Sequence, residues 1–293
     1  MPNAHRFEGV YELEDLQPFQ KHLRERFNDH KLMVFPRLNI TDDEFGVIRD
    51  LLGFGTAEDM DSPYKVDYKG FFESGWPSVN GILNPWHMEN LYMNHPPVYG
   101  IWHMEKFQCE PGSGSTIFVD MGKVCRKLPY HLRKFAEQTR TVGLPGWFPI
   151  DRELFNSSVK GTTFWFPTDV EGEEVPVTAH PLIQKHPITG EEILRTITQM
   201  PPGDTSTREI YLDPGYLVNE FTDWLHTELE DESNRLWQHW EEGDVAVVDI
   251  YSLAHAVTDG FFLNERLMNG RFYFGHGVFG VGEDPMQRRK VDG

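Results

Sequence analysis

The segment NPWHMENLYMNHPP, residues 84–97, places His87 and Glu89 two positions apart in a stretch that ends on two prolines. In a β-strand, residues i and i+2 point to the same side of the sheet. An imidazole and a carboxylate can therefore converge on one metal ion from a single strand end. Late in the chain, GDVAVVDIYSLAHAV (243–257) places His255 at the end of another predicted strand.

Two imidazoles and one carboxylate on one side of a metal leave three coordination positions open, an arrangement typical of non-haem Fe(II) oxygenases. The triplet His-x-Glu alone is a weak signal, because the chain holds 13 His and 46 acidic residues. The tetrapeptide Trp-His-Met-Glu occurs twice with the same strand geometry. Residue types alone therefore leave two candidate pairs, His87 with Glu89 and His103 with Glu105.

The overall composition excludes several classes of protein. With 27 basic and 46 acidic residues, the formal net charge is −19, which repels phosphate backbones and anionic membranes and argues against nucleic-acid and membrane partners. The two cysteines form no CxxC pair and no disulfide framework. We find neither the apolar core of a signal peptide nor an apolar run of about 18 residues. These features predict a reduced, cytoplasmic protein.

Apolar spacing predicts helices at 14–30, 41–53, 122–138 (broken near Pro129) and 214–238, and a strand at 31–38. From about residue 64, short apolar runs separated by Gly, Pro and Asn predict strands, and the stretch 141–215 holds only short ones. GDVAVVDI (243–250) and RFYFGHGVFGV (271–281) predict the last strands. Because β-α-β alternation is absent, the pattern favours an antiparallel barrel or sandwich with helical additions.

The blocks that contain these residues resemble the taurine dioxygenase/2,4-D dioxygenase (TauD/TfdA) family. WHMENLYMNHPP and CEPGSGSTIFVDM are similar to the family's W-H-x-D, P-P and P-x-G-G-x-T-x-F-x-D-M patterns. AHPLIQKHPITGEEIL (179–194) resembles its H-P-x-x-x-x-H-P-x-T-G segment, and WEEGDVAVVDIYSLAH (240–255) resembles its W-x-P-G-D-x-x-x-x-D-N-x-x-x-x-H segment. The blocks occur in family order between about 84 and 275.

The resemblance implies a mainly β fold with flanking helices (α+β) and a double-stranded β-helix core, also called a jelly roll or cupin-like core. It predicts one domain over 1–293, with a helical and strand addition at about 1–60 and the core at about 64–283. It also chooses between the two candidate pairs. The family's first metal-binding His precedes Pro-Pro, as His87 does, whereas His103 follows it. His87, Glu89 and His255 then match the three iron ligands.

Two further positions match residues that bind the co-substrate in the family. Thr116 matches the residue whose hydroxyl binds a carboxylate of 2-oxoglutarate. An Arg after the distal His clamps the far carboxylate, to which a guanidinium offers two parallel hydrogen bonds. Arg266 lies eleven residues after His255, a common family spacing. Arg271 follows the turn signal Asn269-Gly270, at the predicted start of a strand, where the family's Arg sits. The turn signal favours Arg271, with Arg266 as the alternative.

The resemblance thus implies an oxidoreductase, a dioxygenase that uses Fe(II), 2-oxoglutarate and O₂ to oxidise an unactivated C–H bond of a small molecule, with release of succinate and CO₂. Glu89 departs from the usual Asp; Glu also occurs in clavaminate-synthase-like amino-acid hydroxylases, which slightly favours an amino-acid-like substrate. The alternatives are a non-catalytic jelly-roll binding protein and a zinc-dependent hydrolase with the same ligands. Hydroxylation, desaturation and cyclisation all stay open, as does a homo-oligomer.

Overall fold

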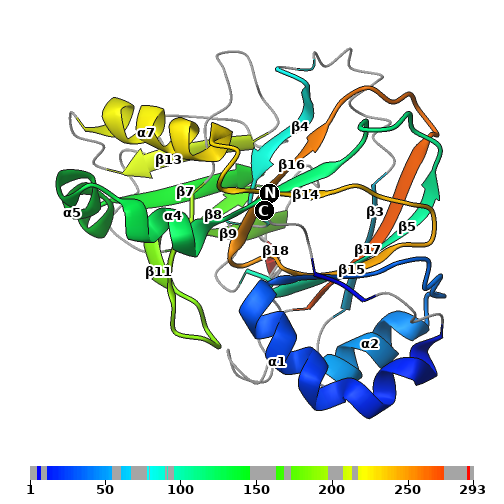
Figure 1. Ribbon diagram of the computed structural model, residues 1–293. Coiled ribbons are helices and arrows are strands. Elements are labelled where there is room, and N and C mark those ends of the chain that lie inside the picture. The colour runs from blue at the N-terminus through cyan, green and yellow to red at the C-terminus, as the bar shows by residue number, and fades with distance from the viewer. Residues whose placement is uncertain are drawn as a thin grey trace.

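The structure is a computed structural model with a mixed architecture of helices and antiparallel sheets (Figure 1). It describes residues 5–7, 12–54, 61–66, 78, 80–89, 91, 96–145, 163–167, 173–196, 207–212, 217–273 and 289–290. No helix in this described part of the chain is long and apolar enough to cross a lipid bilayer.

The larger sheet has six strands, and its neighbouring strands are antiparallel except for the first pair. Its central strand β5 lies in the stretch after residue 64 where the sequence predicts short strands. In spatial order, the strands are β1 (His5–Arg6), β2 (Leu32–Phe35), β15 (Val245–Asp249), β5 (Tyr99–Phe107), β17 (Arg266–Tyr273) and β3 (Asp61–Val66).

The smaller main sheet has four antiparallel strands, in the order β14 (Arg235–Gln238), β6 (Thr116–Asp120), β16 (Leu253–Thr258) and β4 (Ile82–His87). Strands β4 and β16 lie far apart in the sequence but are hydrogen-bonded neighbours in space. This pairing brings together the two segments that carry the predicted metal ligands.

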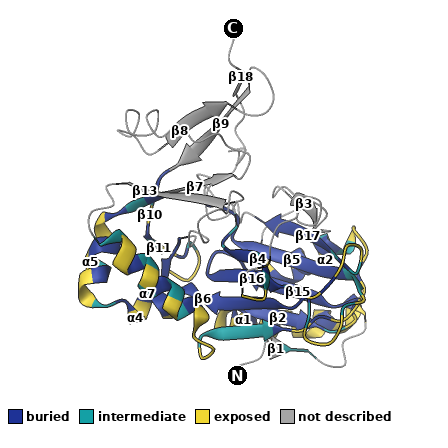
Figure 2. Cartoon of the chain, turned by 90° about the horizontal axis from the view of Figure 1, so that it is seen from above, coloured by how far each residue is buried: buried dark blue, intermediate teal, exposed yellow. Residues whose placement is uncertain are grey.

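The two main sheets pack on each other through one buried hydrophobic cluster. Trp102, Met104 and Met268 contribute from the larger sheet, and Phe118 and Leu253 contribute from the smaller one. Since successive residues of a strand point to opposite faces, these positions define the inner face of each sheet. Figure 2 shows that the central strands of both sheets are buried. The inner faces therefore enclose a buried hydrophobic core, as in other two-sheet proteins.

Helices α1 (Gln20–His30) and α2 (Glu44–Leu52) cover the outer face of the larger sheet, after the 3-10 helix η1 (Leu13–Phe19). The rings of Phe27 in α1 and Phe54 after α2 both contact Tyr99 of β5. The hydroxyl and backbone N–H of Thr41 donate to the Glu44 carboxylate, which fixes the start of α2. The predicted helices at 14–30 and 41–53 are thus confirmed, although the first begins as a 3-10 helix.

Three more helices lie beside the smaller main sheet: α4 (Met121–Lys127), α5 (Tyr130–Gln138) and α7 (Val218–Glu230). The predicted break near Pro129 separates α4 from α5. The helix predicted at 214–238 is too long, because it ends at Glu230 and the chain then forms β14. The Asn234 amide donates to the Glu228 carbonyl at 2.7 Å and Arg235 Nε to the Leu229 carbonyl at 2.8 Å. These side chains cap the last helical turn.

The remaining strands form small sheets, as expected for a stretch that holds only short strands. They are β7 (Arg140–Pro145) with β10 (His180–Pro181) and β13 (Thr207–Leu212); β11 (Ile183–Lys185) with β12 (Glu192–Leu194); and β8 (Thr163–Pro167) with β9 (Glu173–Thr178) and β18 (Arg289–Lys290).

The last strand of the larger sheet begins earlier than predicted. It starts at Arg266, and Asn269 and Gly270 lie in its middle, paired with β5 on one side and β3 on the other. The predicted turn before Arg271 is therefore wrong. Asn-Gly favours a hairpin turn in isolation, but pairing with two neighbouring strands holds it extended here. The predicted strand residues 274–281 lie outside the described residues.

Candidate metal centre

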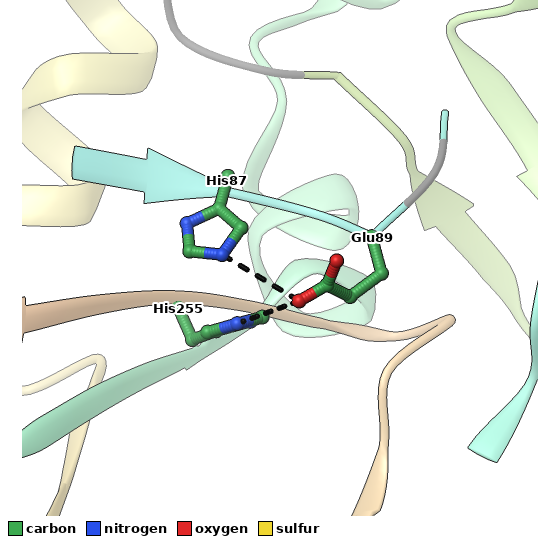
Figure 3. Close-up of side chains that lie close together, drawn as sticks. All are labelled: His87, Glu89 and His255. Atoms are coloured by element: carbon green, nitrogen blue, oxygen red, sulfur yellow. Dashed lines mark ion pairs between the residues drawn. The ribbon is translucent and has the colours of Figure 1, made fainter. Parts of the chain in front are cut away.

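His87 and His255 are direct cross-strand neighbours in the pairing of β4 with β16. Their ring centroids lie 4.1 Å apart. Glu89 follows β4 by two residues, and its Oε1 lies 3.6 Å from His87 Nε2 and 3.3 Å from His255 Nε2 (Figure 3). The pairing of two strands thus brings all three predicted ligands to one point.

The three side chains fit a single metal ion. One ligand atom from each lies within 4.8 Å of the other two, and this is the group of metal-binding side chains found in the described residues. Two ligands about 2.1 Å from one ion and at a right angle lie about 3 Å apart, close to the observed separations. The Pro85 carbonyl lies 2.7 Å from His87 Nδ1, so that nitrogen can carry the proton and leave Nε2 free for a metal.

The charges at the site also suit a divalent cation. Burial raises the pKa of Glu89, but hydrogen bonds from His255 and His87 outweigh it and hold that pKa well below its ordinary value. Burial and the charge of His87 lower the pKa of His255 to about 4. Burial lowers the pKa of His87, but the Glu89 carboxylate outweighs it, so that pKa is raised. At neutral pH, an ionised carboxylate and a neutral His255 imidazole are therefore ready to bind a metal.

His103 of the second Trp-His-Met-Glu tetrapeptide lies elsewhere. Its neighbours in β5, Trp102 and Met104, belong to the inner core, so the His103 side chain points to the outer face of the sheet. It pairs with Val245 and Asn269 in the neighbouring strands. The structure does not bring it near the other predicted ligands.

Thr116 and Arg266 meet inside the protein, close to the candidate metal centre. Arg266 Nη2 donates to Thr116 Oγ1 at 3.2 Å, and Arg266 Nε donates to the Gly114 carbonyl at 2.9 Å. Thr116 pairs with Val257, two residues from His255 along β16, a distance of about 7 Å. Both side chains are only 1% exposed. The buried guanidinium of Arg266 and the hydroxyl of Thr116 therefore lie close to the three metal-ligand side chains.

Arg271 lies on the opposite face of the same strand. Its guanidinium is 4.8 Å from the centre of the Phe45 ring in α2 and 3.2 Å from Asp42. Arg266 and Arg271 are five residues apart, and Met268 and Phe272 place the even-numbered positions of β17 on the inner face. The preference for Arg271 rested on the turn that does not form, and the geometry favours Arg266.

A cavity of about 360 Å³ lies away from this centre, between α7 and the outer face of the smaller main sheet. Its walls include Trp86 and Ile117 from the sheet and Leu229 from the helix. Trp86 precedes His87 in β4, so the two side chains point to opposite faces. The sheet therefore separates the cavity from the metal-ligand side chains.

Two interior tryptophans belong to the site but were not singled out from the sequence. Trp240 Nε1 donates to Thr116 Oγ1 at 2.9 Å, and the Trp102 ring centroid lies 5.1 Å from that of His255. Trp240 opens the block WEEGDVAVVDIYSLAH, which was the available signal for its importance. For Trp102 the available signal was strand alternation. Successive residues of a strand point to opposite faces, so Trp102 lies on the inner face if His103 lies on the outer one.

Two packed antiparallel sheets that carry two imidazoles and a carboxylate at one strand end define the class of metal-dependent oxygenases with a facial ligand triad. The family model described as "Taurine catabolism dioxygenase TauD, TfdA family" matches residues 4–271. The chain therefore belongs to the TauD/TfdA family and is a 2-oxoglutarate-dependent dioxygenase, an oxidoreductase.

Solved structures agree with the fold. A taurine dioxygenase from Burkholderia xenovorans is 19% identical with a TM-score of 0.62, over 99% of this chain and 93% of the other. A provisionally assigned alpha-ketoglutarate-dependent 2,4-D dioxygenase from the same organism is 18% identical with a TM-score of 0.55, over 87% of each chain. No curated protein matches the chain.

Proposed function

We propose that this enzyme binds Fe(II) through His87, Glu89 and His255 and couples the oxidation of 2-oxoglutarate to that of an unactivated C–H bond in a small molecule. The observation that carries the proposal is the meeting of these three side chains, whose ligand atoms all lie within 4.8 Å of one another. Two imidazoles and a carboxylate suit ferrous iron and leave positions open on it. Bound iron and the keto acid would supply the oxidising chemistry, with succinate and CO₂ as products.

The strand order supports a jelly-roll core. Taken along the chain, β3, β4, β5 and β6 alternate between the two main sheets, and β14, β15, β16 and β17 alternate again. This alternation of eight strands between two facing sheets is the pattern of a jelly roll. We infer that these strands form the double-stranded β-helix and that the helices and small sheets are additions to the same single domain.

Arg266 and Thr116 are the proposed contacts for the far carboxylate of 2-oxoglutarate. The neutral oxygens of Gly114 and Thr116 orient the guanidinium on the inner face. Gly114 has a φ of 62°, a conformation that glycine adopts without strain, and a Cβ there would lie 3.4 Å from Arg266 Cδ. In this position the guanidinium can donate charge-assisted hydrogen bonds to a carboxylate. We therefore assign the clamp to Arg266 rather than to Arg271.

The metal-ligand side chains also keep the site charged for metal binding and partly closed to water. The low pKa of the Glu89 carboxyl keeps this side chain ionised, and burial of His255 together with partial burial of His87 and Glu89 limits access of water. The similar structures are named for taurine and 2,4-D, which supports a small-molecule substrate. Glu89 in place of the usual Asp keeps an amino-acid-like substrate as the first class to screen.

The test is anaerobic addition of Fe(II) and then 2-oxoglutarate to the metal-free protein, followed by admission of O₂. We expect a visible charge-transfer absorption that needs both additions, and release of succinate after O₂ enters. The variant Glu89→Ala should lose both signals. A protein that binds Zn(II) but gives no absorption band and no succinate would support the zinc-hydrolase alternative instead. A protein that binds no metal would support the non-catalytic alternative.

A further inference from the structure

Trp102 packs against the metal-ligand residue His255 inside the protein. The two ring centroids lie 5.1 Å apart at an interplanar angle of 56°. Phe118 completes the group, with its ring centroid 5.7 Å from that of Trp102 and 5.8 Å from that of His255. Trp102 is only 1% exposed. One face of the region around His255 is therefore formed by a large, rigid aromatic ring.

His255 has fewer polar contacts than the other histidine ligand. His87 Nδ1 lies 2.7 Å from the Pro85 carbonyl, a contact that fixes the ring. His255 Nδ1 is buried and makes no hydrogen bond of normal geometry with the described residues, although the Leu253 backbone interacts with His255. Histidines that bind metals usually donate their second N–H to a fixed acceptor, which sets the ring orientation. For His255, packing has to take over much of that role.

The position of the Trp102 ring is itself fixed by packing against its neighbours. Its Nε1 is buried and has no hydrogen-bond partner in the part of the chain that the structure describes, so no polar contact from these residues anchors the indole. The cross-strand neighbours of Trp102 are small, Ala246 in β15 and Gly270 in β17. Two positions earlier on the same face is Gly100. Small residues on three sides leave room for the indole to pack, tilted, against the His255 ring.

Gly100 has the tightest contact with this ring. A Cβ on Gly100 would lie 2.8 Å from Trp102 Nε1 and 3.2 Å from Ile250 Cγ2. The first distance is shorter than real Cβ contacts, so the indole would have to move. Gly100 lies in the regular part of β5, where alanine fits the backbone. An alanine here would therefore act through the position of Trp102.

We propose that Trp102 is a positioning residue of the metal centre: its indole fixes the orientation of the His255 imidazole, and Gly100 leaves the space that the indole needs. This inference rests on the proposed metal site. A metal ligand must be held within about 0.5 Å of its productive position by the side chains behind it. Loss of the indole, or its displacement, should therefore weaken metal binding although every ligand is still present.

The experiment measures Co(II) binding to the metal-free protein by calorimetry, because Co(II) replaces Fe(II) without oxidation and the readout does not depend on activity. Gly100→Ala and Trp102→Leu should each weaken binding about tenfold, the lower end of the range for groups that orient metal ligands. Trp102→Phe, which keeps an aromatic ring, should bind more tightly than Trp102→Leu. Adding Gly100→Ala to Trp102→Leu should weaken Co(II) binding no further, because the indole that the new Cβ would displace is already absent.

The matched control is Trp237→Leu, the same change in a tryptophan on the outer face of the smaller main sheet, which should leave Co(II) affinity unchanged. A purely structural role for Trp102 would lower the unfolding temperature of the metal-free protein and leave the dissociation constant at the wild-type value. That result in Trp102→Leu and Gly100→Ala would overturn the inference and leave the proposed function standing. Failure of the wild-type protein to bind Co(II) would instead overturn the proposed function and this inference with it.

Discussion

Arg266 and Thr116 lie 150 positions apart in the chain, yet Arg266 Nη2 is 3.2 Å from Thr116 Oγ1. The contact joins the inner face of the larger sheet to that of the smaller one, because Arg266 comes from β17 and Thr116 from β6. It also places a buried cation beside the strand that carries His255. The two main sheets therefore each contribute one side of the proposed co-substrate site.

The first prediction separates the two arginines. Arg266→Met should weaken binding of 2-oxoglutarate at least thirtyfold, since removal of one partner of a buried charge pair costs about 2–5 kcal/mol. Arg271→Met should leave that affinity unchanged and lower the free energy of unfolding by about 1–3 kcal/mol, because it loses the contact with Phe45, the ion pair with Asp42 and the hydrogen bonds to Asn269 and Gly270. Titration of 2-oxoglutarate into the metal-loaded protein measures the affinity of both variants. The reverse pattern would restore Arg271 as the clamp.

A second prediction concerns Trp240, whose Nε1 donates to Thr116 Oγ1 at 2.9 Å. Trp240→Phe removes this donor and frees the Thr116 hydroxyl to rotate. A hydrogen bond of this kind contributes about 1 kcal/mol, so the Michaelis constant for 2-oxoglutarate should rise about fivefold while metal affinity stays constant. Steady-state kinetics and Co(II) titration measure the two quantities. Equal losses of 2-oxoglutarate affinity and metal affinity would mean that Trp240 supports the packing of the whole core and does not act through Thr116.

A third prediction concerns stability with and without metal. An ion held by His87, Glu89 and His255 links β4 to β16, so it stabilises only the folded chain. At a free metal concentration a hundred times the dissociation constant, the gain is about 2.7 kcal/mol, which corresponds to about 5–10 °C in unfolding temperature for a chain of this size. A chelator should reverse the gain. His255→Ala should show no metal-dependent shift, and a full shift in that variant would exclude His255 as a ligand.

A fourth prediction concerns the buried ammonium group of Lys31, whose Nζ lies 2.9 Å from Asp120 Oδ1 and 2.7 Å from Glu191 Oε2. Burial raises the pKa of Glu191, but Lys31 and Arg126 outweigh it, so that pKa is lowered. Its stabilising contribution is therefore present above 4.5 and is lost as the pH falls through the lowered value. Burial lowers the pKa of Lys31, but Asp120 and Glu191 outweigh it and that pKa is raised.

The contribution of Lys31 is thus complete below 10.5 and is lost as the pH rises through the raised value. Lys31→Met should lower the free energy of unfolding at neutral pH by about 2–4 kcal/mol, because it leaves the Asp120 carboxylate without its cation and Glu191 with Arg126 alone. The variant should also lose less stability than the wild type at both pH extremes. Urea unfolding at acid, neutral and alkaline pH measures this. Parallel curves for the two proteins would contradict the assignment.

Several elements could be predicted from the sequence because their signals are local. The helices at 14–30 and 41–53 and the break at Pro129 all depend on residues a few positions apart. Two predictions failed where a distant partner changed the outcome. The segment 235–238 continues the helical pattern of α7 but pairs with β6, and Asn269-Gly270 resembles a turn but lies between β5 and β3. Pairing in a sheet overrides local propensity in both cases.

The sequence by itself determined the chemistry available at the centre: two histidines and a glutamate at strand ends, with His87 and Glu89 on one side of a single strand. It did not place the two arginines in one strand, because Asn269-Gly270 predicts a turn between them; in the folded protein both lie in β17 and point to opposite faces. Only the tertiary structure decided which of those faces is the inner one, because that depends on the pairing of β17 with β5 and on the packing of one sheet against the other. Arg266 is therefore inside beside Thr116, whereas Arg271 lies under α2.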